Sequence, residues 1–390
     1  MGFVDIFQDI ASALKSFGAS YYSNSLEMIG GFLAVILLMM KVYTFGRDRL
    51  LKKFRRFILG EDGFWDKAPT RNMARHCESL SKGLPILTIA NFKGGVGKST
   101  TAANLAAFFD SRGARVLLID FDYQGSLTDS IVKADDLNFG AVELINPDAS
   151  ANQVLNCTVR PISPFRSTDL LASYYTLNRV ESRAVFKWLT GEDKRDIRYN
   201  THRILSSTLT RQKYDIVIID APPRLMTATV NALCASTHIL IPTILDGVSA
   251  SAAINTVDAI IKIKNALSPS LKIVGILPTF VSQAGAFGPS ERKSLEYLAQ
   301  EISSRHAGVQ DAPIQIFEDE RILRRAAISK VAGEKVAFFE DTEVHQMYGS
   351  LGWKLANSFG ASFMRKIANE RSGTSEEIGN PESNVVKLGA

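Results

Sequence analysis

The segment Asn91–Thr101 reads Asn-Phe-Lys-Gly-Gly-Val-Gly-Lys-Ser-Thr-Thr, and it constrains the fold of this 390-residue chain more than any other feature. A glycine-rich turn between a strand and a helix lets successive backbone N–H groups point at phosphate oxygens, and the helix adds its positive N-terminal end. Residues 84–91 form an apolar run of buried-strand length, and residues 101–112 have helical apolar spacing closed by Gly113. Strand, loop and helix therefore come in the order that a phosphate-binding loop requires.

Each residue type in this loop has a predicted role. Lys98 is expected to reach the β- and γ-phosphates, and the Ser99 hydroxyl is expected to bind Mg²⁺. A second lysine, Lys93, precedes Lys98 in the loop, and this extra lysine indicates a particular way of using the nucleotide beyond binding it. The residues predicted to line the nucleotide site are Lys93, Gly94, Gly95, Val96, Gly97, Lys98, Ser99 and Thr100.

Two further apolar runs end in acidic residues. Residues 114–122 end in Asp120 and Asp122, and residues 214–223 contain Asp220 after a similar run. Buried parallel strands read as continuous apolar runs, and ligands collect at their carboxyl ends. A single acid at a strand end is more often a turn or cap residue, but three on the same edge as a phosphate loop favour ligands of metal and water. The three acids are therefore expected to converge near the metal.

On these residues the chain resembles the ParA/MinD family of deviant Walker A ATPases. The resemblance covers about residues 84–370 and implies an α/β fold, with a mostly parallel sheet flanked by helices. The specific matches are Lys93–Thr101, Asp120–Gly125 with residues 126–128, and Asp220–Pro223, and the weaker ones are Ile241 and Pro242, residues 273–279 and residues 322–336.

The resemblance implies three catalytic residues. Lys98 is similar to the phosphate-loop lysine, and Lys93 is similar to the lysine that reaches the nucleotide of the partner subunit in a face-to-face homodimer. Asp122 resembles the acid that positions or activates the attacking water. A lysine delivered across an interface can act much like an arginine finger. Tyr123 departs from the family, which often has proline at this position.

The resemblance also implies the metal and base sites. Asp120 and Asp220 resemble the acids around Mg²⁺, and the base of the nucleotide is placed near Pro278 and Thr279. ATP is favoured over GTP, because the chain contains no Asn-Lys-x-Asp or Thr-Lys-x-Asp segment. The expected cofactors are therefore ATP and Mg²⁺.

The N-terminal region has a different character. Residues 28–40 carry no charge, and the apolar zone at 26–46 approaches the length of one bilayer crossing. Residues 41–57 hold seven basic residues and one acid, a surplus of +6 against +5 for the whole chain. Such a flank marks the cytoplasmic side and suits anionic lipid. The sequence thus predicts a single-pass protein of the cytoplasmic membrane, with lipid contact through residues 26–57 and the ATPase domain in the cytoplasm. The alternative is a buried or self-associating helix in a cytoplasmic protein.

Five parts make up the predicted organisation of the chain. They are an amphipathic segment at 1–25, a transmembrane helix at 26–46, a basic connector at 47–83, the ATPase domain at 84–371 and a disordered tail at 372–390.

Two segments of the ATPase domain carry weaker signals. Residues 140–212 mix helix and loop patterns and could shape a partner surface. Residues 344–368 are expected to form a closing helix, with Trp353, Phe359 and Phe363 facing the core.

The combined prediction is a membrane-anchored, ParA-like ATPase. It would dimerise on ATP, hydrolyse it slowly with Mg²⁺, and recruit or position an activating or cargo partner. The alternatives are a bacterial tyrosine-kinase-like membrane protein of the capsule-regulating type and a soluble DNA-partitioning ATPase. Lys93 and the absence of any tyrosine after Tyr348 weigh against the kinase. DNA binding is left open, but residues outside 41–57 sum to −1, which does not favour it.

Overall fold

The computed structural model describes residues 39–41, 43, 46–48, 65–69, 72–132, 140–160, 164–282, 285–309, 313–329 and 336–369. The chain divides into two compact units, Met1–Phe64 and Trp65–Ala390. The described residues of the first unit are helical, and the second unit contains the sheet and the phosphate loop.

The structure corrects the predicted membrane span. Among the described residues, no helix is long and apolar enough to cross a bilayer, so the prediction of a single-pass protein with a transmembrane helix is wrong on this finding. The physical weakness of the prediction is that the charge-free core of the run, residues 28–40, is only 13 residues long, whereas a span needs about 20. Most of the predicted span and lipid-contact region, as well as segments 1–25 and 372–390, lies outside the described residues.

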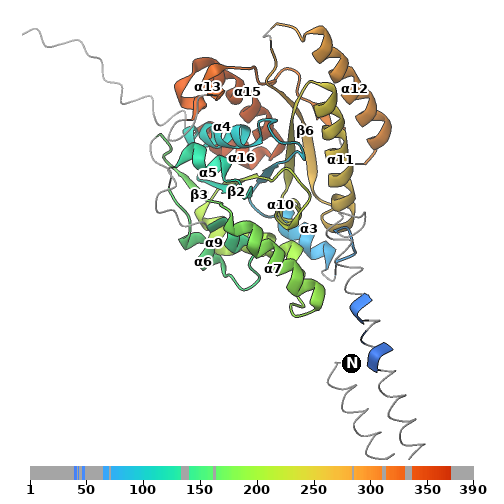
Figure 1. Cartoon of the computed structure of the whole chain (residues 1–390). Coiled ribbons are helices and arrows are strands. Elements are labelled where there is room, and N and C mark those ends of the chain that lie inside the picture. Colours follow the sequence, from blue (N-terminus) through green and yellow to red (C-terminus); the bar gives the residue numbers. More distant parts are fainter. Residues whose placement is uncertain are drawn as a thin grey trace, which may run out of the picture. The chain divides into compact units, whose positions relative to one another are not determined.

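Seven strands form one sheet in the order β3-β2-β4-β1-β5-β6-β7. All pairings between these named strands are parallel, which confirms the predicted α/β fold (Figure 1). The strands are β1 (Ile86–Ile89), β2 (Val116–Asp120), β3 (Thr168–Leu171), β4 (Ile216–Asp220), β5 (His238–Ile244), β6 (Lys272–Thr279) and β7 (Gln315–Ile316).

Helices cover both faces of this sheet, because alternate residues of a strand point to opposite sides. Leu87 and Ile218 join one apolar core, while Ile86 and Ile219 join the other. Helices with residues in the first core are α4 (Lys98–Ser111), α5 (Ser126–Ile131), α13 (Ala326–Ser329), α14 (Ala337–Glu340), α15 (Thr342–Ser358) and α16 (Ala361–Asn369). Helices with residues in the second are η1 (Gly140–Leu144), α6 (Ala151–Asn156), α7 (Thr176–Thr190), α8 (Asn200–Leu205) and α10 (Thr227–Ala235).

The remaining helices lie at the margins of these layers. The pair α11 (Gly247–Leu267) and α12 (Pro289–His306) pack side by side beyond β5 and β6 (Figure 1). The others are α3 (Met73–Ser81), η2 (Ile197–Tyr199) and α9 (Thr208–Lys213).

The C-terminal part of the domain forms two helices where the sequence predicted one. Gly360 adopts a φ of 103°, a conformation that breaks the helix, so that α15 ends before it and α16 begins after it. The predicted orientation of the aromatic residues is confirmed, since Phe363 is buried and Trp353 and Phe359 pack against the first core.

Residues ahead of the predicted domain start also belong to the sheet-containing unit. Trp65 is buried, and the guanidinium of Arg198 donates hydrogen bonds to the carbonyl oxygens of Trp65 at 2.8 Å and Lys67 at 2.7 Å. Helix α3 buries His76 and Leu80. The division of the chain therefore falls before Trp65, and the domain start at residue 84 stays a prediction.

Candidate nucleotide site

The phosphate loop connects the end of β1 to the start of α4. Gly95 and Gly97 have φ values of 74° and 85°, a left-handed conformation that glycine adopts without the steric cost of a side chain. A Cβ added at Gly94 or Gly95 would meet no atom within 4 Å, so the loop is open on that side. An open left-handed turn ahead of a helix matches the geometry of a phosphate cradle.

Lys98 is the first residue of α4 and lies over this loop. Its ammonium donates a hydrogen bond to the carbonyl oxygen of Lys93 at 2.9 Å, and the residue is buried. Burial lowers the pKa of Lys98, while the nearby carboxylates of Asp220 and Asp122 raise it. The predicted phosphate-loop lysine and two of the predicted acids are thus close enough to interact.

Strands β2 and β4 place Asp120 and Asp220 next to each other as register partners. Asp120 is fully buried, and its Oδ2 accepts hydrogen bonds from the backbone N–H and the hydroxyl of Thr128 at 2.9 and 2.8 Å. Its Oδ1 accepts from the backbone N–H of Asp122 at 3.0 Å. Burial, followed by the charge of Asp220, raises the pKa of Asp120 well above its usual range.

Asp220 differs from Asp120 in its hydrogen bonding. Both of its carboxylate oxygens are buried and accept no hydrogen bond of normal geometry within the described part of the chain. Burial raises the pKa of Asp220 to about 7, although the Ser99 hydroxyl lies near enough to lower it. Unsatisfied buried oxygens beside a phosphate loop fit the oxygen-ligand chemistry of Mg²⁺. Ser99 and Asp220 therefore fit the predicted metal role better than Asp120, whose oxygens already accept hydrogen bonds.

Side chains alone do not form a metal site in the described residues. No group of three or more His, Cys, Asp or Glu residues there could hold an ion. Mg²⁺ commonly binds through one or two protein oxygens together with water and substrate phosphates, so this donor set suits a metal that arrives with a nucleotide.

Asp122 lies in the turn that follows β2. Its side-chain Oδ1 accepts a hydrogen bond from the backbone N–H of Gln124 at 3.1 Å, and its carbonyl oxygen accepts from Gly125 at 2.9 Å. The residue is partly buried, so its carboxylate can reach a molecule in the open loop region. Its predicted role in water activation stays a prediction.

Lys93 contacts two residues that the sequence prediction missed. Its ammonium donates to the hydroxyl of Ser249 at 2.6 Å and lies 3.7 Å from the carboxylate of Asp246. Asp246 caps the N-terminus of α11, accepting from the backbone N–H of Ser249 at 2.7 Å. The rule that singled out Asp120, an acid just after an apolar strand, also applies to Asp246, and the Asp-x-x-Ser spacing is typical of a helix cap.

Pro278 and Thr279 end strand β6 beside the phosphate loop. The Thr279 hydroxyl donates to the carbonyl oxygens of Val96 at 2.9 Å and Thr243 at 3.1 Å, and the residue is buried. These contacts stabilise the loop from β6. The placement of the nucleotide base near these two residues stays a prediction.

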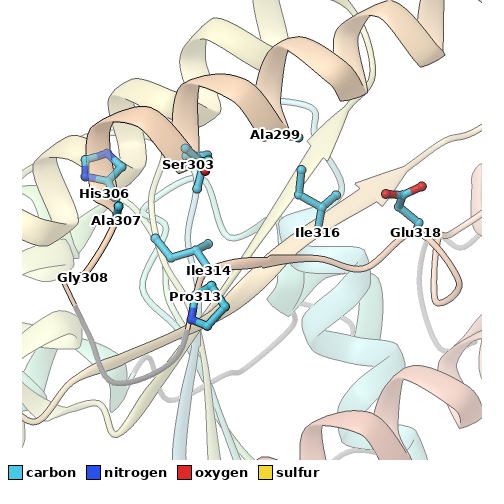
Figure 2. Close-up of a pocket in the computed structure, with 10 residues that line it drawn as sticks. Ala299, Ser303, His306, Ala307, Gly308, Pro313, Ile314, Ile316 and Glu318 are labelled. Atoms are coloured by element: carbon cyan, nitrogen blue, oxygen red, sulfur yellow. The ribbon is translucent and has the colours of Figure 1, made fainter.

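A cavity of about 570 Å³ lies elsewhere, between α12 and the segment that contains β7 (Figure 2). Its lining includes Ile302 and His306 of α12 and Ile316 of β7, and it contains none of the predicted nucleotide-site residues. It is therefore separate from the phosphate loop.

Comparison with known proteins gives the class and then the family. The family model described as an AAA domain matches residues 84–273, which include the phosphate loop and the ends of β2 and β4. The chain is 33% identical over 196 residues to the chromosome partitioning protein ParA of Myxococcus xanthus. That match covers 50% of this chain and 64% of the relative.

Two further relatives are matched over a larger share of their own length. The chromosome-partitioning ATPase Soj of Thermus thermophilus is 30% identical over 198 residues, covering 50% of this chain and 68% of Soj. The sporulation initiation inhibitor protein Soj of Bacillus subtilis is 30% identical over 197 residues, covering 50% of this chain and 72% of the relative. The chain therefore belongs to the ParA/Soj family of P-loop ATPases.

Solved structures agree with this fold. Apo McdA of Cyanothece superposes with a TM-score of 0.56 at 18% identity, covering 70% of this chain and 99% of McdA. A plasmid partition protein of Borrelia burgdorferi bound to AMPPNP superposes with a TM-score of 0.51 at 21% identity, covering 74% and 99%. For a P-loop ATPase of this family the cofactors are ATP and Mg²⁺, in agreement with the sequence prediction.

Proposed function

We propose that this chain is an ATP hydrolase that dimerises on ATP and uses the ATP-bound dimer to recruit or position a cargo or activating partner. One observation supports this most directly: Lys98 interacts with both Asp122 and Asp220 beside an open glycine loop. Relatives named for chromosome partitioning support a cargo-positioning role.

Each side chain has a distinct task in this proposal. The loop N–H groups and Lys98 bind the phosphates, and Ser99 with Asp220 holds Mg²⁺ at the end of β4. Asp120 organises the turn after β2 through Thr128 and the N–H of Asp122. Asp122 orients the attacking water. When bound, ATP with Mg²⁺ supplies the cleavable phosphate and a divalent charge that stabilises the transition state.

Lys93 is proposed to act across the dimer. In the single chain its ammonium is bound by Ser249 and Asp246 of the same subunit. Reaching the nucleotide of a second subunit requires it to exchange those contacts for phosphate oxygens, with which an ammonium forms charge-assisted hydrogen bonds. Dimerisation is then coupled to the presence of ATP.

Three substitutions test this assignment with one binding assay and one turnover assay. Lys98→Ala should abolish ATP binding, because it removes the buried charge over the loop. Lys93→Ala and Asp122→Ala should bind ATP but lose turnover, by about 10³-fold for a charge delivered across an interface and about 10²-fold or more for water positioning. Fluorescent-nucleotide titration and phosphate release measure the two quantities.

The pattern across the three variants is the decisive result. ATP affinity unchanged in Lys98→Ala would remove the phosphate-loop assignment. Wild-type turnover in Lys93→Ala, or a wild-type chain that stays monomeric with ATP in light scattering, would remove the dimer mechanism.

A further inference from the structure

Two loops at the carboxyl edge of the sheet are joined by a pair of side chains. Tyr123 follows Asp122 in the turn after β2, and Arg224 follows the Asp220–Pro223 segment after β4. The Arg224 guanidinium lies over the Tyr123 ring, 5.1 Å from its centroid, and its Nη2 donates a hydrogen bond to the Tyr123 hydroxyl. We call Tyr123 and Arg224 the interloop clamp.

The turn that carries Asp122 contacts the rest of the domain near both of its ends and through Tyr123 in its middle. Its start is fixed by the hydrogen bond from the N–H of Asp122 to Asp120. Its end passes close to the chain at Ser173, since a Cβ added at Gly125 would lie 3.1 Å from the carbonyl oxygen of Ser173. Tyr123 lies between these points and packs its ring against the second core, so the clamp restrains the part of the turn next to Asp122.

The other side of the clamp is anchored to α10. The carbonyl oxygen of Arg224 accepts a hydrogen bond from the Thr229 hydroxyl at 2.5 Å. Glu181 of α7 in turn accepts from the N–H of Ala228 at 2.5 Å, in the first turn of α10. Arg224 thus extends from a loop whose following helix is held by buried contacts, which makes it a suitable fixed point for the turn after β2.

We propose that Tyr123 and Arg224 are positioning residues that hold the Asp122 carboxylate in place by tying its turn to the loop that follows Asp220. This inference rests on the proposed hydrolysis. It gives a physical role to Tyr123 at a position where the family often has proline. Neither residue binds the nucleotide in this proposal, so they affect the rate of the chemical step and leave ATP affinity unchanged.

Turnover and ATP affinity of the full chain separate this role from a binding or folding role. Tyr123→Phe removes the hydroxyl and keeps the ring, and Arg224→Gln removes the charge from an exposed side chain. Arg224→Gln should lower kcat about three- to fivefold, the scale of one exposed cation–ring contact, and Tyr123→Phe, which loses only the hydrogen bond, should lower kcat by a smaller factor. The ATP dissociation constant of each variant should stay within about twofold of wild type. The double variant should lose no more than Arg224→Gln alone, because that variant already removes the guanidinium from both the hydrogen bond and the ring contact. Arg224→Lys, which keeps the charge but not the planar fork, should recover part of the rate.

Arg112→Gln serves as the matched control. Arg112 also lies over an aromatic ring, 5.2 Å from the Trp353 centroid, but at the C-terminal end of α4, away from the phosphate loop. This variant should keep wild-type kcat, and thermal unfolding of all variants checks that they are folded.

Several results would overturn the clamp. They are an unchanged kcat in Arg224→Gln, a loss of ATP affinity equal to the loss of kcat, or additive losses in the double variant. A wild-type chain that does not hydrolyse ATP would instead overturn the proposed function itself, and the clamp with it. Wild-type turnover with unaffected variants would overturn the clamp alone.

Discussion

Asp120 and Asp220 lie side by side at the ends of β2 and β4. In a buried site, ionising both carboxyl groups has a high free-energy cost unless a cation is near. The two carboxyl groups differ in their hydrogen bonds. Asp120 receives three hydrogen bonds and is committed to the turn after β2, whereas the oxygens of Asp220 accept none of normal geometry among the described residues. This difference is the reason why Asp120 is proposed to organise the turn and Asp220 is proposed to bind Mg²⁺.

A third buried carboxyl, Glu181, gives a prediction that does not depend on nucleotide. It accepts the N–H of Ala228, faces the charges of Arg224 and Asp122, and has its pKa raised by burial to about 7 from 4.5. A raised folded-state pKa stabilises the protein fully below pH 4.5, and this contribution is lost as the pH rises through 7. The full effect is about 3 kcal/mol.

Glu181→Gln should remove this pH dependence while keeping an oxygen that can accept from Ala228. The free energy of unfolding of wild type minus that of the variant should therefore fall between pH 4.5 and pH 8, measured by urea titration at several pH values. Asp120 and Asp220 titrate in both proteins, so their contributions cancel in this difference. A difference that stays constant over this range would mean that Glu181 titrates normally.

At the residue scale, local signals in the sequence predicted which groups lie together, and the roles assigned to those groups stay predictions. Lys98, Asp120, Asp122 and Asp220 are placed together as expected, because strand ends of a parallel sheet share one edge. The partners of these groups were missed, since contacts such as that between Tyr123 and Arg224 join segments about a hundred residues apart and leave no local pattern.

At the scale of helices, the packing of α15 on α4 shows how little space the first core leaves. A Cβ added at Gly352 would lie 2.2 Å from the ring of Phe108, which is itself surrounded by Phe109, Phe338 and Trp353. Glycine at this position lets α15 approach α4, the helix that follows the phosphate loop, closely.

Gly352→Ala should therefore destabilise the chain by about 1 to 3 kcal/mol through overpacking. Gly349→Ala is the matched control, because it lies in the same helix and its added Cβ would meet no atom within 4 Å. The control should be neutral or stabilising by up to about 1 kcal/mol, the helix propensity difference. Thermal unfolding of the two variants decides the matter, and equal effects would contradict the close contact.

Element prediction followed the strength of the apolar pattern. Strands β1, β2 and β4 were expected because they are buried on both faces and read as continuous apolar runs. Residues 273–279 of β6 entered the prediction only as a weaker match of the family resemblance. Strand β3 was missed, because half of its four residues are polar and its Asp169 is buried through an ion pair with Lys213 at 2.9 Å and a hydrogen bond from Tyr214 at 2.8 Å. Such compensation depends on neighbours in space.

At the scale of the whole molecule, the contacts of the buried Arg198 guanidinium indicate where the ATPase unit starts. Arg198 pairs with Asp196 at 2.6 Å and donates to the carbonyl oxygens of Trp65 and Lys67. Its side chain also lies over the ring of Trp188. A buried guanidinium that loses two acceptors keeps the cost of desolvation without the compensating hydrogen bonds.

Deleting residues 1–64 should leave the stability of the remaining unit unchanged, whereas deleting residues 1–83 should cost about 3 kcal/mol or more, because each hydrogen bond to a charged group is worth about 1.5 to 3 kcal/mol. The longer deletion also removes Leu80 from the core. Urea unfolding of the two fragments and the full chain measures the difference. In full-length Arg198→Gln, which keeps residues 65–83 but removes the cation, a comparable loss is expected. Equal stability of the two fragments would instead place the start of the unit at residue 84, where the sequence alone put it.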